Sequence, residues 1–491
     1  MCGILAIFGP DYSKGSDLLS LMKHRGPDNK SHWSKPEVYL GHQRLSILDL
    51  NPRSNQPFIR NNLILIYNGE IYNFEELIVQ HNLKVETKSD TEVVLAMFEK
   101  YGSECVNFFN GMFAFLIYNR KNGDYFVARD RLGIKPLYYF KDKKGNTIFS
   151  SEIAPIVEHV KPNLSNFAIR QYKKFRMCVN NDTIYKNIKH FPAAHFTHNL
   201  DYVTRYWDID ITPKSPPTID ELRELIISSV NYRKISDVAV GSYLSGGLDS
   251  TILTAILTPN HTWTIGFEDL NEFNWATLAA KKYKTEHHEM VVDLDIFYET
   301  MEWMVKKRME PLSVPNEVLI YIMTKSVKEK NTVILSGEGA DELFFGYDRI
   351  FRWANASKTL DYDNFDKKYC YGKHEDNEII DYALSGIKGN TVLEKINYYF
   401  LTNHIQGLLR RVDNSTMLCS VEARVPFLDH RLVNRIAGCP FEWKMGETFK
   451  SPLKEAFSDM VPKEILSRPK MGFPVPIDYD IWLKANLGVL F

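Results

Sequence analysis

Short apolar runs separated by polar turns dominate the first two hundred residues. Examples are LILIYNGEI (63–71), MFAFLIYN (112–119), DYFVARD (124–130) and PLYYF (136–140). Runs of this length, rich in β-branched and aromatic residues, predict β-strands. One stretch differs, because residues 89–102 repeat apolar side chains at helical spacing between a serine cap and a glycine. The N-terminal part is therefore expected to be rich in β-structure.

Strand and helix patterns alternate after a proline-rich segment. ITPKSPPTID (211–220) carries three prolines, and we interpret residues 208–218 as a linker. Beyond it, strands are predicted at 238–245, 261–267 and 287–293, and helices at 249–257 and 275–284. Residues after about 350 have mainly helical patterns. This alternation predicts a parallel sheet covered by helices.

Composition and charge exclude several classes of protein. The 491 residues carry a formal net charge of −1, which argues against nucleic acid or an acidic membrane surface as a partner. No apolar run approaches the length of about 18 residues that a membrane span needs, and no signal peptide is evident. The six cysteines are scattered, which is neither a disulfide framework nor a zinc spacing. A reducing cytoplasm is the expected location.

Two loops after predicted strands carry candidate chemistry. YLSGGLDST (243–251) combines a Gly-Gly turn with a helix start, where close backbone approach and free N–H groups favour a phosphate. A plain strand–helix turn is the alternative, and it would be preferred for this motif alone. LSGEGADELFFGY (335–347) adds Glu338, Asp341 and Glu342. Loops at the carboxyl ends of parallel strands converge, so the pair predicts a site for a nucleotide with magnesium.

These loops resemble the ATP-pyrophosphatase loop of glutamine-dependent asparagine synthetases. The resemblance extends over nearly the whole chain, through MCGI, HRGPD (24–28), HQRLSILD (42–49), YNGEIYN (67–73), SDTEV (89–93), VEARVPFLDHRL (421–432), KSPLKEAF and MGFPVP. It implies an α/β protein of two domains. Residues 2–207 would form an N-terminal α-β-β-α sandwich of the N-terminal nucleophile type, a class II glutamine amidotransferase. Residues 219–491 would form a parallel-sheet α/β ATP-pyrophosphatase domain with additional helices.

Cys2 can be core filler or the first residue of the working protein. A thiolate is a strong nucleophile, but the thiol needs a nearby base. A free α-amino group titrates near neutral pH, so removal of Met1 would supply that base. The resemblance implies that Cys2 attacks the side-chain amide of glutamine, forms a thioester and releases ammonia.

The resemblance also assigns residues around glutamine. Asn68 and Gly69 match the oxyanion pair, and Arg44 matches the partner of the glutamine carboxylate. The other matched positions are Glu70 and Asp90 near the α-amino group, and Leu45, Ile47 and Leu48 in the pocket wall. Three of these have plainer alternatives: a surface ion pair for Arg44, a helix-terminal charge for Asp90, and a hairpin turn for Asn68-Gly69. With a candidate nucleophile at Cys2, we favour the functional interpretation.

For the second site, the resemblance implies that ATP adenylates aspartate and that ammonia then displaces AMP. The matched nucleotide contacts are Leu244, Ser245, Gly246, Gly247, Asp249, Ser250, Ile265, Ser336 and Gly337. Asp249 and Asp341 match magnesium ligands, and Glu338 matches a proton acceptor beside the reacting centre. Lys450 matches a lysine that stabilises phosphate charge, with a solvated helix-start lysine as the alternative.

The acceptor carboxylate and the oligomeric state each have an alternative. Departures from the family pattern at Glu310-Pro311, at FPAAH (191–195) and at Phe345 put the acceptor carboxylate in doubt. Aspartate is the expected acceptor, and a sugar acid or another carboxylate is the alternative. A non-catalytic protein is disfavoured, because no key residue is missing. Glutamine, aspartate and ATP are the expected partners, and a homodimer is left open. His287 and His288 are expected to point apart on a strand, so we interpret them as structural.

Overall fold

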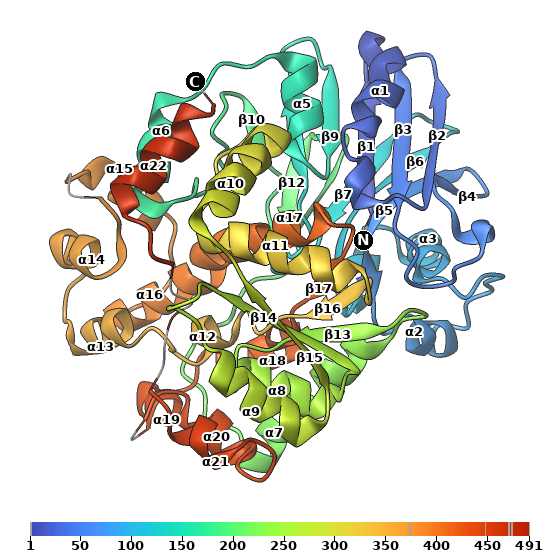
Figure 1. The fold of residues 1–491 in the computed structure, drawn as a ribbon. Helices are drawn as coiled ribbons and strands as arrows, with labels where there is room; N and C mark the ends of the chain where they lie inside the picture. The colour runs from blue at the N-terminus through green and yellow to red at the C-terminus, as the bar shows by residue number, and fades with distance from the viewer. Residues whose placement is uncertain (1, 373–374, 447, 470–471, 473–474, 491) are drawn as a thin grey trace.

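The computed structural model describes residues 2–372, 375–446, 448–469, 472 and 475–490, and it contains three β-sheets (Figure 1). Two six-stranded antiparallel sheets occupy the N-terminal part, and a five-stranded parallel sheet lies in the C-terminal part. The predicted α/β architecture with two domains is therefore confirmed. Within the described residues, none of the helices combines the length and the apolar character that crossing a bilayer requires.

The two antiparallel sheets stack face to face. The first has the order β10-β8-β9-β1-β3-β2 and is made of β1 (Gly3–Phe8), β2 (Asn29–Lys35), β3 (Val38–Arg44), β8 (Tyr138–Lys141), β9 (Thr147–Ser150) and β10 (Ile188–His190). The second has the order β12-β11-β7-β6-β5-β4 and is made of β4 (Phe58–Arg60), β5 (Leu63–Ile71), β6 (Gly111–Asn119), β7 (Tyr125–Arg129), β11 (His195–His198) and β12 (Tyr202–Arg205).

Helices cover both outer faces, so the layers are α-β-β-α. They are α1 (Gly15–Ser20), α2 (Phe74–Gln80), α3 (Asp90–Tyr101), α4 (Cys105–Phe108) and α5 (Ile153–Val160). Helix α6 (Asn166–Phe175) packs instead against helices of the C-terminal part. Strand β1 shows why its sequence is apolar throughout. Ile4 and Ala6 pack between the sheets, while Leu5 and Ile7 pack against the helices α1 and α5. A strand buried on both faces needs a continuous apolar run, because side chains alternate across it.

The C-terminal sheet has the order β15-β14-β13-β16-β17, and all its pairings are parallel. Its strands are β13 (Val240–Tyr243), β14 (His261–Gly266), β15 (Glu286–Val291), β16 (Val333–Leu335) and β17 (Glu422–Arg424). The last strand lies in the region predicted to be helical. Its three residues include two charged side chains, which are buried as an ion pair, so no apolar run marks it.

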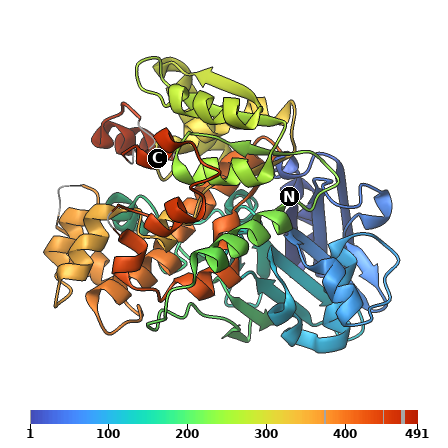
Figure 2. The same ribbon diagram turned by 90° about the horizontal axis from the view of Figure 1, so that it is seen from below.

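Helices pack on both faces of this sheet (Figures 1 and 2). They are α7 (Ile219–Lys234), α8 (Leu248–Leu257), α9 (Phe273–Tyr283), α10 (Leu294–Arg308), α11 (Asn316–Lys328), α12 (Ala340–Leu343), α17 (Ile405–Met417) and α18 (His430–Ile436). The remaining helices are α13 (Asp348–Ala356), α14 (Tyr362–Tyr369), α15 (Asn377–Leu384), α16 (Val392–Tyr399), α19 (Phe441–Met445), α20 (Ser451–Ala456), α21 (Lys463–Ser467) and α22 (Tyr479–Gly488).

The two parts share a core. The segment between β12 and α7 has no helix or strand, yet Ile209 and Ile211 within it are buried. One apolar cluster contains residues of both parts, among them Met112, Leu132, Leu244, Leu335 and Val425. Buried polar contacts also join them: Arg25 donates to Asp413 at 3.0 Å, and Asn110 donates to Asp429 at 3.3 Å. The predicted linker region is therefore packed against the protein rather than extended in solvent.

A buried lysine in α19 gives a test of the C-terminal packing. Lys444 is fully buried, donates to the Ala437 carbonyl oxygen at 3.0 Å and lies 4.1 Å from the Phe345 ring centroid. Burial lowers its pKa to about 7. Between pH 7 and its unfolded pKa, the unfolded chain holds a proton that the folded chain has released, so stability rises with pH. Below pH 7 the folded protein carries the full cost of the buried charge.

Lys444→Met should therefore stabilise the protein, by about 2 kcal/mol at pH 6. Thermal unfolding of the variant and of the exposed control Lys463→Met, followed at pH 6, 8 and 10, checks this. The gain should shrink toward zero by pH 10. A gain that grows with pH would contradict the assignment.

Candidate functional site

Cys2 lies immediately before β1, where residues from three other segments of the chain contact it. Its backbone N–H donates to Asn68 Oδ1 at 3.0 Å, and Arg25 Nε donates to its carbonyl oxygen at 3.0 Å. Its Sγ is 4.0 Å from the carbonyl oxygen of Leu45. Burial raises the pKa of the Cys2 thiol, so the thiol is neutral at pH 7 and needs a base to react. Met1 lies outside the described residues, and its removal stays a prediction.

Asn68 and Gly69 lie inside β5 and pair with Ala114 and Phe113 of β6, so the hairpin-turn alternative is wrong. The Asn68 amide uses its oxygen for Cys2, while its Nδ2 is buried and has no hydrogen-bond partner among the described residues. A buried donor without a partner is costly, which suggests that a ligand oxygen completes it. At Gly69 a Cβ would lie 2.2 Å from the Met112 carbonyl oxygen, so only glycine fits.

Arg44 is buried, and its guanidinium group holds the loop that follows β3. It donates to the Asn51 carbonyl oxygen at 3.0 Å and to Asn55 Oδ1 at 2.7 Å. The surface ion pair considered as an alternative is therefore not formed. Leu45 offers its carbonyl oxygen to the thiol, while its side chain and that of Ile47 pack in a small cluster with residues of the C-terminal part. Leu48 packs partly buried on the second sheet.

Glu70 and Asp90 are buried acids at the same site. Asp90 accepts hydrogen bonds from the Tyr67 hydroxyl and the Ile71 N–H, both at 2.8 Å, while burial raises its pKa to about 6. Burial and the neighbouring Glu422 raise the pKa of Glu70 well above its usual range. Glu70 also lies 3.7 Å from Arg424, which pairs with Glu422. Glu70 of the N-terminal site is thus in contact with the C-terminal part.

The second candidate site is a cavity of 390 Å³ at the carboxyl end of the parallel sheet. Most of the predicted nucleotide contacts line it: Leu244, Ser245, Gly247, Asp249, Ser250, Ile265, Ser336 and Gly337. Helix α8 begins at this cavity. Its N-cap residue is Gly247, so no side chain of the cap accepts a hydrogen bond from the first turn of the helix. Its first N–H groups are therefore oriented as in a phosphate site.

Gly246 shapes the same loop without lining the cavity. Its φ is +68°, and a Cβ would lie 2.4 Å from the Trp275 backbone, so glycine is required. Its carbonyl oxygen accepts from Arg468 at 2.9 Å.

Lys450 lies between two acids that stand in the first turns of helices α8 and α12. Its Nζ is 2.6 Å from Asp249 Oδ2 and 2.5 Å from Asp341 Oδ1, and only 1% of the residue is exposed. Burial would lower the pKa of Lys450, but the two carboxylates outweigh burial and raise it. The solvated helix-start lysine considered as an alternative is therefore wrong. A permanent cation next to the phosphate loop fits a polyanionic ligand.

Glu338 lines the cavity and pairs with Arg411 of α17 at 3.0 Å. Arg411 and Arg468 also line the cavity, and neither was found by sequence reasoning. Arg411 stands inside an ordinary amphipathic helix, so no local signal marks it. Arg468 precedes MGFPVP, of which Met471, Phe473 and Pro474 lie outside the described residues.

Comparison with known proteins identifies the family. A model described as a glutamine amidotransferase domain matches residues 1–207, and one described as asparagine synthase matches residues 221–489. The chain belongs to the asparagine synthase family. The glutamine-hydrolysing asparagine synthetase 3 of Bacillus subtilis is 30% identical, over 92% of this chain and 82% of the relative. Synthetase 1 of that organism is 29% identical over 99% and 89%, and synthetase 2 of Oryza sativa subsp. japonica is 28% identical over 98% and 78%.

Membership of the asparagine synthase family agrees with the two sites described above. The resemblance inferred from the sequence is confirmed, and the synthase domain implies that this enzyme uses ATP. Most of the residues that the sequence resemblance assigns to ATP line the cavity at the end of the parallel sheet.

Proposed function

We propose that this enzyme is a glutamine-dependent asparagine synthetase that works with two coupled sites. Residues 2–207 would hydrolyse glutamine, residues 208–218 would connect the domains, and residues 219–491 would adenylate aspartate and transfer ammonia to it. The observation that carries the proposal is the buried Nδ2 of Asn68 beside Cys2, which has no hydrogen-bond partner among the described residues. The names of the relatives support the acceptor, and the lysine-bridged acids of the second site support the use of a polyanion.

In the glutaminase step, the Cys2 thiol attacks the glutamine amide carbon after passing its proton to its own α-amino group. Asn68 Nδ2 and the Gly69 N–H would stabilise the oxyanion, and ammonia leaves as the thioester forms. Arg44 would bind the glutamine carboxylate, and Glu70 and Asp90 the α-amino group. Water then hydrolyses the thioester, which releases glutamate and restores the thiol.

Asn68→Asp tests the oxyanion role, because it keeps the oxygen that accepts from Cys2 and removes the Nδ2 donor. We expect kcat for glutamine hydrolysis to fall by about 10²–10³-fold. Ammonia-dependent synthesis, measured in the same preparation, should keep its rate. Equal loss of both activities would instead indicate a folding defect and contradict the role.

In the synthetase step, a carboxylate oxygen of aspartate attacks the α-phosphorus of ATP, and pyrophosphate leaves. The loop 245–250 and Lys450 would bind the pyrophosphate end. Asp249 and Asp341, in the first turns of α8 and α12, present hard carboxylate oxygens to the cavity, a donor set that fits Mg²⁺. Such an ion would neutralise phosphate charge when bound. Glu338 would take a proton as ammonia attacks the acyl carbon and AMP leaves.

The shared apolar core fits the transfer of ammonia between the sites. Met112 lies on β6, which pairs with β5, the strand of Asn68 and Gly69. It belongs to the same buried cluster as Leu244 and Leu335, which lie at the ATP site. Ammonia that entered bulk water would be protonated and would lose its lone pair. We therefore propose that it passes through this apolar region.

The acceptor is tested with amide-15N glutamine and a panel of carboxylic acids. With ATP present, 15N should appear in asparagine when aspartate is supplied, and in no new amide when a sugar acid or glutamate replaces it. Labelling of another acid in preference to aspartate would support the alternative acceptor.

A further inference from the structure

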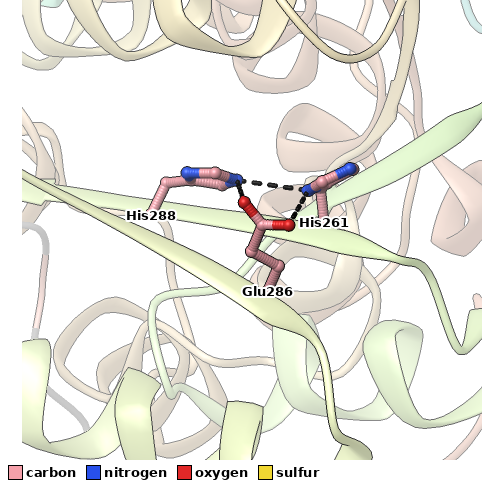
Figure 3. A group of neighbouring side chains, drawn as sticks. All are labelled: His261, Glu286 and His288. Carbon is pink, nitrogen blue, oxygen red and sulfur yellow. Dashed lines mark hydrogen bonds and ion pairs between the residues drawn. The ribbon is translucent and has the colours of Figure 1, made fainter.

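Three side chains of the types that can bind a metal ion lie together on the parallel sheet, outside the residues assigned to either site. His261 opens β14, and Glu286 and His288 are the first and third residues of β15. The two strands are parallel neighbours, and the register places His261 opposite Glu286. Figure 3 shows both rings and the carboxylate pointing toward one another. Sequence spacing alone does not reveal the group, because His261 is far from the other two along the chain.

The three donor atoms have the spacing of a metal site. His261 Nδ1 is 3.2 Å from His288 Nε2, and Glu286 oxygens lie 3.5 Å and 3.7 Å from these two nitrogens. In a tetrahedral zinc site with bonds near 2.0–2.1 Å, neighbouring donors are about 3.3 Å apart. We propose that His261, Glu286 and His288 bind a zinc ion, with water at the fourth position.

The surroundings suit a ligand role. The His261 and His288 side chains are 21% and 23% exposed, so an ion can reach them. His287 points to the other face and bonds Thr262 Oγ1 at 2.9 Å.

The position in the sheet indicates a structural role for the ion. Trp263 and Ile265 of β14 line the ATP cavity two and four residues beyond His261, and the Trp263 ring stacks on that of His288 with centroids 5.1 Å apart. The group is therefore at the amino end of the strands, next to one side chain of the cavity wall. Strand β15 is the edge of the sheet and is joined only to β14. A zinc ion here would fasten the edge strand to its neighbour.

The test uses the full chain after chelator treatment and gel filtration, with zinc sulfate as the probe. A Cys2→Ala background removes the thiol of the glutaminase site as a competing ligand. His261→Ala, His288→Ala and Glu286→Gln remove the donors in turn, and His287→Ala on the opposite face is the matched control. Zinc per chain is measured by equilibrium dialysis. Co²⁺ absorption then distinguishes nitrogen and oxygen ligands from thiolates.

We expect one tightly bound ion per chain in the background protein and in His287→Ala, and at least tenfold weaker binding after each donor substitution. Saturating zinc should raise the thermal midpoint by about 5 °C only where the donors are intact. The Glu286→Gln change is at an exposed side chain, so it reports binding even if a histidine variant fails to fold. Absence of binding, unchanged binding in Glu286→Gln and His288→Ala, or a thiolate band with Co²⁺ would overturn the proposal.

Discussion

Cys2→Ala is expected to abolish glutamine-dependent synthesis while synthesis from added ammonia continues at its normal rate. The substitution removes the only nucleophile proposed for glutamine, so glutamine hydrolysis should fall by at least about 10⁴-fold. The described residues that line the ATP cavity come from positions 243–472 and do not include Cys2, so the chemistry of that cavity should persist. Glutamate and asparagine release, each assayed with glutamine and with ammonium chloride, give the comparison.

Cys370→Ala is the matched control, since that free thiol lies just after α14 and outside both sites. It should keep both activities. Loss of ammonia-dependent synthesis in Cys2→Ala would contradict the two-site scheme. Mass spectrometry of the active enzyme should also show that Met1 is absent, because an amide nitrogen at Cys2 cannot act as the base.

Lys450→Met should have the reverse effect to Cys2→Ala: synthesis is lost while glutamine hydrolysis is kept. It removes the cation between Asp249 and Asp341, so two carboxylates would repel the phosphates that Lys450 is proposed to bind. We expect synthesis from either nitrogen source to fall by about 10³-fold, while glutamine hydrolysis stays within a few-fold of normal. Hydrolysis serves as the internal check of folding, and the exposed Lys463→Met serves as the matched control. Normal synthesis in Lys450→Met would remove this lysine from the mechanism.

Much of the fold could be predicted from local pattern. Strand β5 matches the apolar run 63–71, and β14 begins at the predicted residue, because alternation and turn chemistry act over short distances. Strand β17 could not be predicted, since its charged residues are paired only after Glu422 and Arg424 come together inside the protein. The burial of Lys444 could not be predicted for the same reason. A lysine is typical of the protein surface, and only the folded chain places this one against Phe345.

The candidate sites also combine residues predictable from local motifs with residues that only the folded chain brings together. Residues in recognisable motifs, such as Asn68 and Lys450, were found in the sequence, and the structure removed their plainer alternatives. Arg411 and Arg468 reach the ATP cavity from distant segments, and His261 meets His288 through strand register. Such groupings arise from tertiary contacts, which no short window of sequence carries.

The central claim is that aspartate is activated as an acyl-adenylate and then aminated by ammonia derived from glutamine. Aspartate labelled with 18O in its β-carboxylate tests it most directly. During synthesis from glutamine and ATP, one 18O atom should move to the phosphate of AMP for each asparagine formed, with none in pyrophosphate. The appearance of 18O in inorganic phosphate together with ADP, or of unlabelled AMP alongside asparagine, would contradict it.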